Sequence, residues 1–472
     1  MSFTRRNFLR SSAAMAITGS TGLATALSSF SAKAADTSGY KALVCVFLKG
    51  GLDCHDTVIP YDTGSYSQFA NARSSLINNY RNIGGTSSRE RDALLPLTPT
   101  NAADLVGRKY GLPPKLDSMH TLFGNGRAAI IGNVGPLIEP LNRTTFQDRT
   151  GTRPDQLFSH NDQQATWMSL RPEGQATGWG GQFADAANRS GANGNPVFSA
   201  ISMAGNEVFL IGQETQQYQL NPRSGAQTIR DLELQSLRGS GRNSERLQQI
   251  LEEHYDANGN TSNNLFERDL INSTRRAISA NTRFNEAREA GVGISTVFPE
   301  GGLGDQLRTV AETIALRDLL NVNRQVFIVT MGGFDSHSDQ AQNLPARQTA
   351  VTQSIAAFFE ATKDIGVEND VTTFTASDFG RTLTANGDGT DHGWGGHHFV
   401  VGGAVNGGAI YGEMPQSGLE HAQDSNNGRL IPTTSIEQFA APLGRWFGLN
   451  EAELTDALPS LGNFNAPPLT FI

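Results

Sequence analysis

The chain has 472 residues, of which 38% are hydrophobic, and its formal net charge is −9. This acidic balance makes nucleic acid and anionic lipid unsuitable partners. After the first 34 residues no stretch has the roughly 18 consecutive apolar residues that a membrane span requires. Two cysteines, Cys45 and Cys54, exclude a disulfide framework, and their spacing allows either one bridge between them or two free thiols.

The first segment is predicted to be an export signal. Residues 4–9 read TRRNFL, which is the twin-arginine pattern, and a weakly apolar run follows from Ser11 to Phe30. Ala32, Lys33 and Ala34 fit a cleavage site with small residues. We therefore expect a signal peptide over residues 1–34, recognition by the twin-arginine export machinery, and a mature protein in the periplasm or outside the cell. Cleavage would remove four basic residues and no acidic ones, which makes the mature net charge −13.

Short apolar runs bounded by turn signals predict buried strands, since a strand covered on both faces is apolar throughout. They are Ala42–Leu48, Ala128–Ile131, Gln325–Thr330 and Val371–Ala376. Helical spacing is found in Pro113–Phe123, Gly304–Leu320 and Asn343–Ile365. Strand, helix and strand in succession predict an α/β fold with three α/β/α layers around a mainly parallel central sheet.

Polar stretches interrupt this pattern. Residues from Gln213 to about position 300 predict a helical insertion, with helical runs near Asn243–Tyr255 and Leu265–Ala287; a separate domain is the alternative. Ser67–Ala103 predicts a smaller polar insertion, and Ser435–Leu458 predicts two closing helices. We therefore expect one domain over residues 35–472.

Acidic residues and histidines follow the predicted strands. Asp53 follows the first run, Asp335 and His337 follow the third, Asp378 follows the fourth, and His392 lies fourteen residues further on. Because the carboxyl ends of parallel strands meet at one edge of a sheet, these side chains are expected to converge in one crevice. The alternative for each aspartate is a helix N-cap or a turn residue.

Carboxylates and imidazoles together predict a divalent metal site. Zinc, manganese and iron bind such a set, and carboxylates with water also suit magnesium or calcium, so zinc, calcium, magnesium and manganese are not distinguished. The loop DHGWGGHHFVVGG (residues 391–403) adds His397 and His398. Because FVVGG predicts a strand, these two neighbours should face opposite ways, with His392 and then His397 as the metal ligands and His398 as a packing residue.

Several stretches together resemble the exported family called domain of unknown function 1501. They are LVCVFLKGGLDCHDTVIPY, LFSHNDQQATW, TGWGGQFAD, MGGFDSHSDQ, SDFGRT and GTDHGWGGHHFVVGGAVNGGAIYG. The resemblance implies an alkaline-phosphatase-like fold, the superfamily of sulfatases and phosphatases, in which metal ions lie at the carboxyl ends of strands. It places Asp53, Asp335, Asp378 and His392 at metal-ligand positions. The sequence departs from the superfamily at two positions. Phe379 stands where a histidine is common. Asp339 stands where the superfamily has a histidine four residues after the earlier aspartate, and here the histidine, His337, lies two residues after Asp335.

The catalytic residues are less well defined. Superfamily hydrolases place a hydroxyl or modified cysteine at a helix N-terminus, for which Thr57, Ser65 and Ser159 are candidates; their alternatives are a strand residue, a turn residue and an N-cap. His160 could be a ligand, a substrate donor or a buried hydrogen-bonding residue. Arg381 could bind an ester oxyanion or form a salt bridge with Asp378.

Two functions are compatible with these residues. One is an exported metal-dependent hydrolase of sulfate or phosphate esters, acting on a small-molecule or polysaccharide ester. The other is a non-catalytic binding or assembly protein on the same fold, with a decayed or structural metal site.

Overall fold

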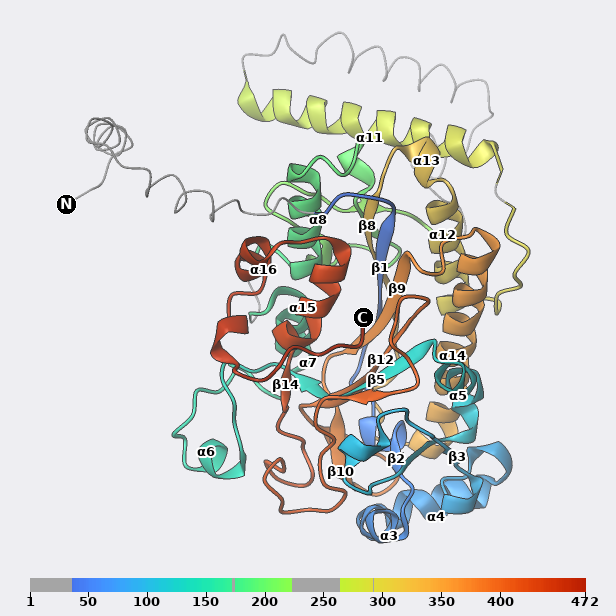
Figure 1. The fold of residues 1–472 in the computed structure, drawn as a ribbon, viewed down its shortest axis with the longest axis vertical. Helices are drawn as coiled ribbons and strands as arrows, with labels where there is room; N and C mark the ends of the chain where they lie inside the picture. Colours follow the sequence, from blue (N-terminus) through green and yellow to red (C-terminus); the bar gives the residue numbers. More distant parts are fainter. Residues whose placement is uncertain (1–35, 172–174, 223–263, 292) are drawn as a thin grey trace, which may run out of the picture.

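The computed structural model describes residues 36–171, 175–222, 264–291 and 293–472 (Figure 1). The predicted signal peptide and the predicted helical run Asn243–Tyr255 lie outside these residues.

A nine-stranded sheet forms the centre of the described part of the chain, in the order β13-β5-β12-β9-β1-β8-β6-β7, with β14 paired to β5. Its strands are β1 (Lys41–Leu48), β5 (Ala128–Gly135), β6 (Ala200–Ser202), β7 (Tyr218–Gln219), β8 (Arg324–Met331), β9 (Val371–Ser377), β12 (Gly396–Gly402), β13 (Ile410–Tyr411) and β14 (Thr434–Ser435). Within this sheet, only β12 pairs antiparallel with its neighbours, which are β5 and β9. The prediction of a mainly parallel sheet in an α/β protein is confirmed.

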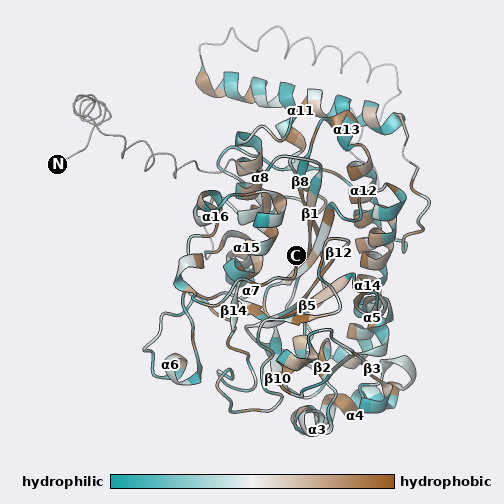
Figure 2. Ribbon diagram, viewed as in Figure 1, coloured by the Kyte–Doolittle hydropathy of each residue, from teal (hydrophilic) through white to brown (hydrophobic). Residues whose placement is uncertain are grey.

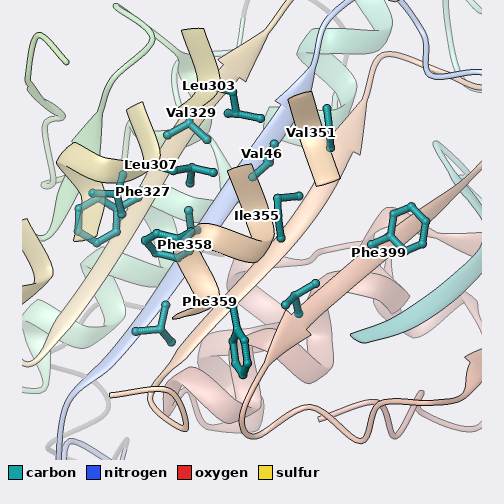
Figure 3. Close-up of a cluster of buried hydrophobic side chains, with 14 of the residues drawn as sticks. Val46, Leu303, Leu307, Phe327, Val329, Val351, Ile355, Phe358, Phe359 and Phe399 are labelled. Carbon is teal, nitrogen blue, oxygen red and sulfur yellow. The ribbon is translucent and has the colours of Figure 1, made fainter. Parts of the chain in front are cut away.

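The central strands are buried along most of their length because helices cover both faces of the sheet. Val44 and Val46 of β1 belong to one buried cluster, whereas Cys45 and Phe47 belong to another. The first cluster also contains apolar residues of α5 (Asp117–Gly124), α12 (Gly302–Ala315) and α14 (Gln340–Asp364), and Figure 3 shows part of it. The second contains residues of α7 (His160–Ser169), α8 (Trp179–Arg189), α15 (Ile436–Phe447) and α16 (Glu451–Ala457). The two sets of helices lie on opposite sides of the sheet in Figure 1, and they carry both hydrophilic and hydrophobic residues in Figure 2.

Within the described residues, the predicted elements match the structure within a few residues, with three differences. Pro113–Phe123 begins as a short 3-10 helix, Pro114–Leu116, and continues as α5. Gly304–Leu320 contains two helices, α12 and α13 (Arg317–Leu320), instead of one. The strand expected after Phe399 begins earlier, at Gly396, so His397 and His398 are strand residues. Cys45 and Cys54 are both buried and free.

The described parts of the two polar insertions pack against the rest of the chain. Ser67–Ala103 contains most of α3 (Thr63–Ala72), all of α4 (Ser74–Ile83) and β3 (Leu95–Pro96). With β2 (Ile59–Pro60) and β4 (Tyr110–Leu112), β3 forms a small three-stranded sheet. The long helix α11 (Leu265–Glu289) packs Phe284 against Phe198 and Tyr218 of the main core.

Among the described residues, the remaining α-helix is α6 (Arg143–Gln147), and the remaining strands are β10 (Arg381–Ala385) and β11 (Thr390–His392), which form an antiparallel pair. Among the described helices, none is both long enough and apolar enough to cross a membrane.

Candidate metal centre

The three central strands end at the same level. Leu48, the last residue of β1, lies beside Met331 of β8 and Ser377 of β9. The loops that follow therefore leave one edge of the sheet together, and they carry Gly50, Asp335 and Asp378. Gly50 has a φ of +116°, and a side chain there would collide with the backbone of Asp335, so glycine allows the two loops to touch.

Asp378 holds a histidine from a distant helix. Its carboxylate has no exposed surface and accepts hydrogen bonds from the backbone N–H of Gly50 at 3.1 and 3.2 Å. Its Oδ2 also lies 2.7 Å from Nδ1 of His160 and accepts from Nε2 of Gln164 at 2.9 Å. His160 and Gln164 are one helical turn apart at the start of α7, and so lie on one face of that helix.

Asp335 is surrounded by three imidazoles. Its Oδ2 lies 3.5 Å from Nε2 of His160, and its Oδ1 lies 3.2 Å from Nε2 of His337 and 3.4 Å from Nε2 of His392. The Nε2 atoms of His337 and His392 are 2.8 Å apart. Three ring nitrogens and a carboxylate therefore converge on a small volume at the strand ends.

Arg381 supports Asp335 from the buried side. Its Nη1 donates to Oδ1 of Asp335 at 3.0 Å and to the carbonyl of Gly50 at 2.9 Å, and its Nε donates to Oγ1 of Thr390 at 3.0 Å. The salt bridge to Asp378 that the sequence allowed is replaced by one to Asp335. Burial alone would raise the pKa of Asp335, but the hydrogen bond and charge of Arg381 outweigh this effect and lower the pKa.

His392 reaches the cluster from the end of β11. Its Nδ1 lies 2.8 Å from the carbonyl of Phe158, a residue with a φ of +72°, which few non-glycine residues adopt. The ring of Phe379 lies 4.8 Å from that of His160 and 4.7 Å from that of His392, measured between centroids. Phe379, which stands where the superfamily commonly has a histidine, therefore packs against two imidazoles of the cluster and contributes no ligand atom.

These residues fit a divalent metal ion. One ligand atom from each of His160, Asp335 and His392 lies within 4.8 Å of the others. Nε2 of His160 is buried without a hydrogen-bond partner, although Nδ1 of the same ring is held by Asp378. A carboxylate that holds one ring nitrogen leaves the other oriented toward a metal, which is the arrangement typical of metal-binding histidines.

The imidazoles differ in their pKa values. The hydrogen bond to Asp378 raises the pKa of His160, against the opposing effect of burial. Burial lowers the pKa of His392 below its usual range, so its neutral form, the form that binds metals, is favoured.

The sequence predicted Asp53 as a metal ligand, whereas in the structure it forms an ion pair with Arg73. Its Oδ2 accepts from Nη1 of Arg73 at 2.7 Å, and its Oδ1 accepts from Nη2 at 2.9 Å, while Gln340 donates to Oδ2 at 2.7 Å. All of these groups are buried. Burial alone would raise the pKa of Asp53, but the charge of Arg73 outweighs it and lowers the pKa. Because a guanidinium already neutralises this carboxylate, we leave Asp53 out of the ligand set.

Thr57, Ser65 and Ser159, the candidate nucleophiles, have different surroundings. Thr57 is buried, and its hydroxyl donates to the carbonyl of Asp53 at 2.7 Å. Ser65 lies in the first turn of α3, a helix that contributes no residue to the cluster. Ser159 directly precedes His160 at the N-terminus of α7, is half-buried, and donates to Oδ2 of Asp162 at 2.7 Å.

His397 and His398 stay outside the cluster. Nδ1 of His397 accepts from the backbone N–H of Asn133 at 3.0 Å, and burial lowers its pKa to about 4. His398 packs against Trp167, with ring centroids 4.9 Å apart, and burial lowers its pKa to about 3. The two rings have separate surroundings, as alternation along a strand predicts. His397 is therefore a buried hydrogen-bonding residue in this structure, which differs from the predicted ligand role.

Three groups that bind the site residues were not predicted from the sequence: Gln164, Arg73 and the carbonyl of Phe158. Gln164 could have been found, because its spacing of four from His160 places both on one helical face. Arg73 lies between α3 and α4, in a polar insertion whose pattern carries no signal for a buried ion pair.

The fold and the cluster define an α/β protein with a histidine and carboxylate centre at the carboxyl edge of a mainly parallel sheet. Residues 40–458 match the family described as "Protein of unknown function (DUF1501)", and the chain belongs to this family. No protein in the curated set matches it. Among solved structures it is similar to the crystal structure of Ps i-CgsB in complex with k-i-k-neocarrahexaose, at 10% sequence identity over 90% of this chain and 77% of that chain, with a TM-score of 0.31. A likeness at that level carries no argument about function.

Proposed function

We propose that this protein is an exported metal-dependent hydrolase of sulfate or phosphate esters. The observation that carries the proposal is the placing of His160, Asp335 and His392, whose ligand atoms lie within 4.8 Å of one another. Asp378 and Arg381 hold two of these ligands from the buried side. A bound divalent ion would polarise the ester and lower the pKa of the attacking group.

The donor set favours one class of metal. Two imidazoles and a carboxylate, with a third imidazole on His337, suit zinc or manganese, whereas calcium and magnesium prefer oxygen ligands alone. We also propose that the fold is alkaline-phosphatase-like and that the protein is exported by the twin-arginine route. The strand-end position of the cluster and the leader sequence support them.

Ser159 is the proposed nucleophile. It is half-buried beside the ligand His160, at the N-terminus of the ten-residue helix α7, where the helix dipole stabilises an oxyanion. Its hydroxyl donates to the carboxylate of Asp162, which could accept the proton when Ser159 attacks. Thr57 is less suitable, because its buried hydroxyl donates to a backbone carbonyl, which cannot act as a base.

A second candidate function is metal-dependent binding without catalysis. It is favoured by the pairing of Asp53 with Arg73, which removes one carboxylate that the superfamily pattern assigns to metal.

A panel of chromogenic sulfate, phosphate monoester and phosphodiester substrates separates these two functions. The mature protein, purified after export, would be tested with and without EDTA, and then with zinc or manganese added back. A hydrolase should turn over at least one ester, lose that activity with EDTA and regain it with metal. A metal-loaded protein that turns over none of them would be a binding protein.

A further inference from the structure

A second concave site lies on loops that also carry residues of the metal centre. A cavity of about 520 Å³ lies between α4, the start of α14 and the loop that joins β10 to β11. Its lining residues are Asn79, Asn82, Ile83, Asp339, Ala341, Gln342 and Asp388. None of them belongs to the proposed ligand set.

The cavity is built on the same two loops as the metal ligands. Asp339 follows His337 by two residues, and Asp388 precedes His392 by four. The backbone N–H of Gln340 donates to the carbonyl of Asp388 at 3.0 Å, and that of Thr390 donates to the carbonyl of Ser336 at 2.9 Å. These bonds hold together the two loops that carry His337, His392 and the two aspartates of the cavity lining.

The lining offers exposed or half-buried hydrogen-bonding groups, although Oδ2 of Asp388 also accepts from the backbone N–H of Asp339 at 3.2 Å. The side-chain amides of Asn79, Asn82 and Gln342 line the cavity, and Asp339 caps no backbone group with its side chain. Each amide has both donors and an acceptor, and each carboxylate accepts. This mixture matches hydroxyl groups, which donate and accept, and Ile83 adds an apolar surface that is 40% exposed.

The charge of the lining limits what can bind there. Asp339 and Asp388 are both exposed, and the lining contains no lysine, arginine or histidine. Two carboxylates would repel a second sulfate or phosphate group, whereas an uncharged hydroxyl group would be accepted.

We propose that this cavity binds the uncharged, hydroxyl-rich part of the substrate, a neutral sugar unit, while the ester group lies at the metal centre. This inference rests on the proposed function only for the position of the ester. It makes the substrate class a carbohydrate that carries few anionic groups.

Saturation-transfer NMR of the mature protein with maltose, cellobiose, lactose and trehalose tests the proposal. At least one of these neutral disaccharides should receive saturation from the native protein. The variant Asn79→Ala, Asn82→Ala, Gln342→Ala should bind it about tenfold more weakly or lose it, because three hydrogen-bonding groups are removed. The control variant Asn78→Ala, Gln353→Ala, which changes exposed amides on the same two helices, should bind as the native protein does.

The outcomes separate this inference from the proposed function. Transfer to none of the sugars, or equal transfer to the native protein and the triple variant, would overturn the sugar site. Turnover of chromogenic esters together with that result would leave the proposed function standing. Sugar contact that disappears in the triple variant, in a protein that hydrolyses no ester, would support the sugar site and contradict the hydrolase.

Discussion

Nδ1 of His160 lies 2.7 Å from Oδ2 of Asp378, a carboxylate with no exposed surface. Together with the hydrogen bond from Gln164, this contact joins α7 to the carboxyl end of β9, although His160 and Asp378 are 218 positions apart in sequence. It fixes the ring of His160 so that Nε2 lies toward Asp335. The metal proposal depends on this orientation, because the same ring rotated away from Asp335 would remove one of the three ligands.

Asp378→Asn should weaken metal binding without removing a ligand. An asparagine has one acceptor oxygen where the aspartate has two, so His160 would lose part of its orientation, and losses of about 10- to 100-fold in metal affinity are typical of such changes. Competition for zinc with a chromogenic chelator measures the affinity. The exposed Asp364→Asn serves as control. An unchanged affinity would mean that Asp378 does not position the ligand.

Ser159→Ala should abolish ester turnover and leave the metal in place. If Ser159 attacks the ester, kcat should fall at least about 100-fold, since removal of a nucleophile leaves only binding and electrostatic effects. Metal content should stay equal to that of the native protein, because Ser159 is not a ligand. Native-like turnover by this variant would show that another group, such as water, attacks the ester.

Asp53→Asn should act on stability more than on metal binding. Asp53 and Arg73 form a buried, bidentate ion pair, and removing one partner of such a pair costs about 3–5 kcal/mol. The double variant Asp53→Asn, Arg73→Met should be destabilised by less than the sum of the two single variants, since neither charge is then left unpaired. Urea denaturation measures the three free energies of unfolding. Loss of bound metal from a folded Asp53→Asn protein would instead return Asp53 to the ligand set.

Glu437→Gln should stabilise the protein at alkaline pH. Burial raises the pKa of Glu437 from 4.5 to about 7. The folded state therefore holds a proton that the unfolded state releases between these two values, and stability should fall as pH rises from about 4.5 to 7. At about 1.4 kcal/mol per pKa unit, the native protein loses on the order of 3 kcal/mol over this window, and a glutamine does not.

Thermal melting of both proteins at pH 5 and pH 8 checks this expectation. The gain in Tm of Glu437→Gln over the native protein should be larger at pH 8 than at pH 5. An equal difference at the two pH values would contradict the pKa assigned to Glu437.

The sequence predicted the sheet well because strands that are buried on both faces are rich in apolar and β-branched residues, and turn signals bound each run. The runs Ala42–Leu48 and Val371–Ala376 agree with β1 and β9 to within one residue. Placing Asp335 and Asp378 at one edge follows from parallel strands that end level, and the register confirms that they do.

The partners of individual side chains could not be predicted in the same way. Asp53 and Asp378 both follow a strand at the same edge, yet one binds Arg73 and the other binds His160. His160 lies in α7 and Arg73 lies at the junction of α3 and α4, both outside the strand pattern, so their positions depend on how α3, α4 and α7 fold back onto the sheet. His397 was predicted as a ligand because its residue type suits metals, but its ring nitrogen meets the backbone of Asn133 on the neighbouring strand β5.

Metal content of the purified protein tests the central claim most directly. Elemental analysis of the native protein, His392→Ala, Asp335→Asn and the control His120→Ala, all purified after export and dialysed, would give the number of ions per chain. We predict about one zinc or manganese ion in the native protein and in His120→Ala, and little or none in His392→Ala and Asp335→Asn while their circular dichroism stays native. A native protein without a divalent ion, or a full complement in both cluster variants, would contradict the account.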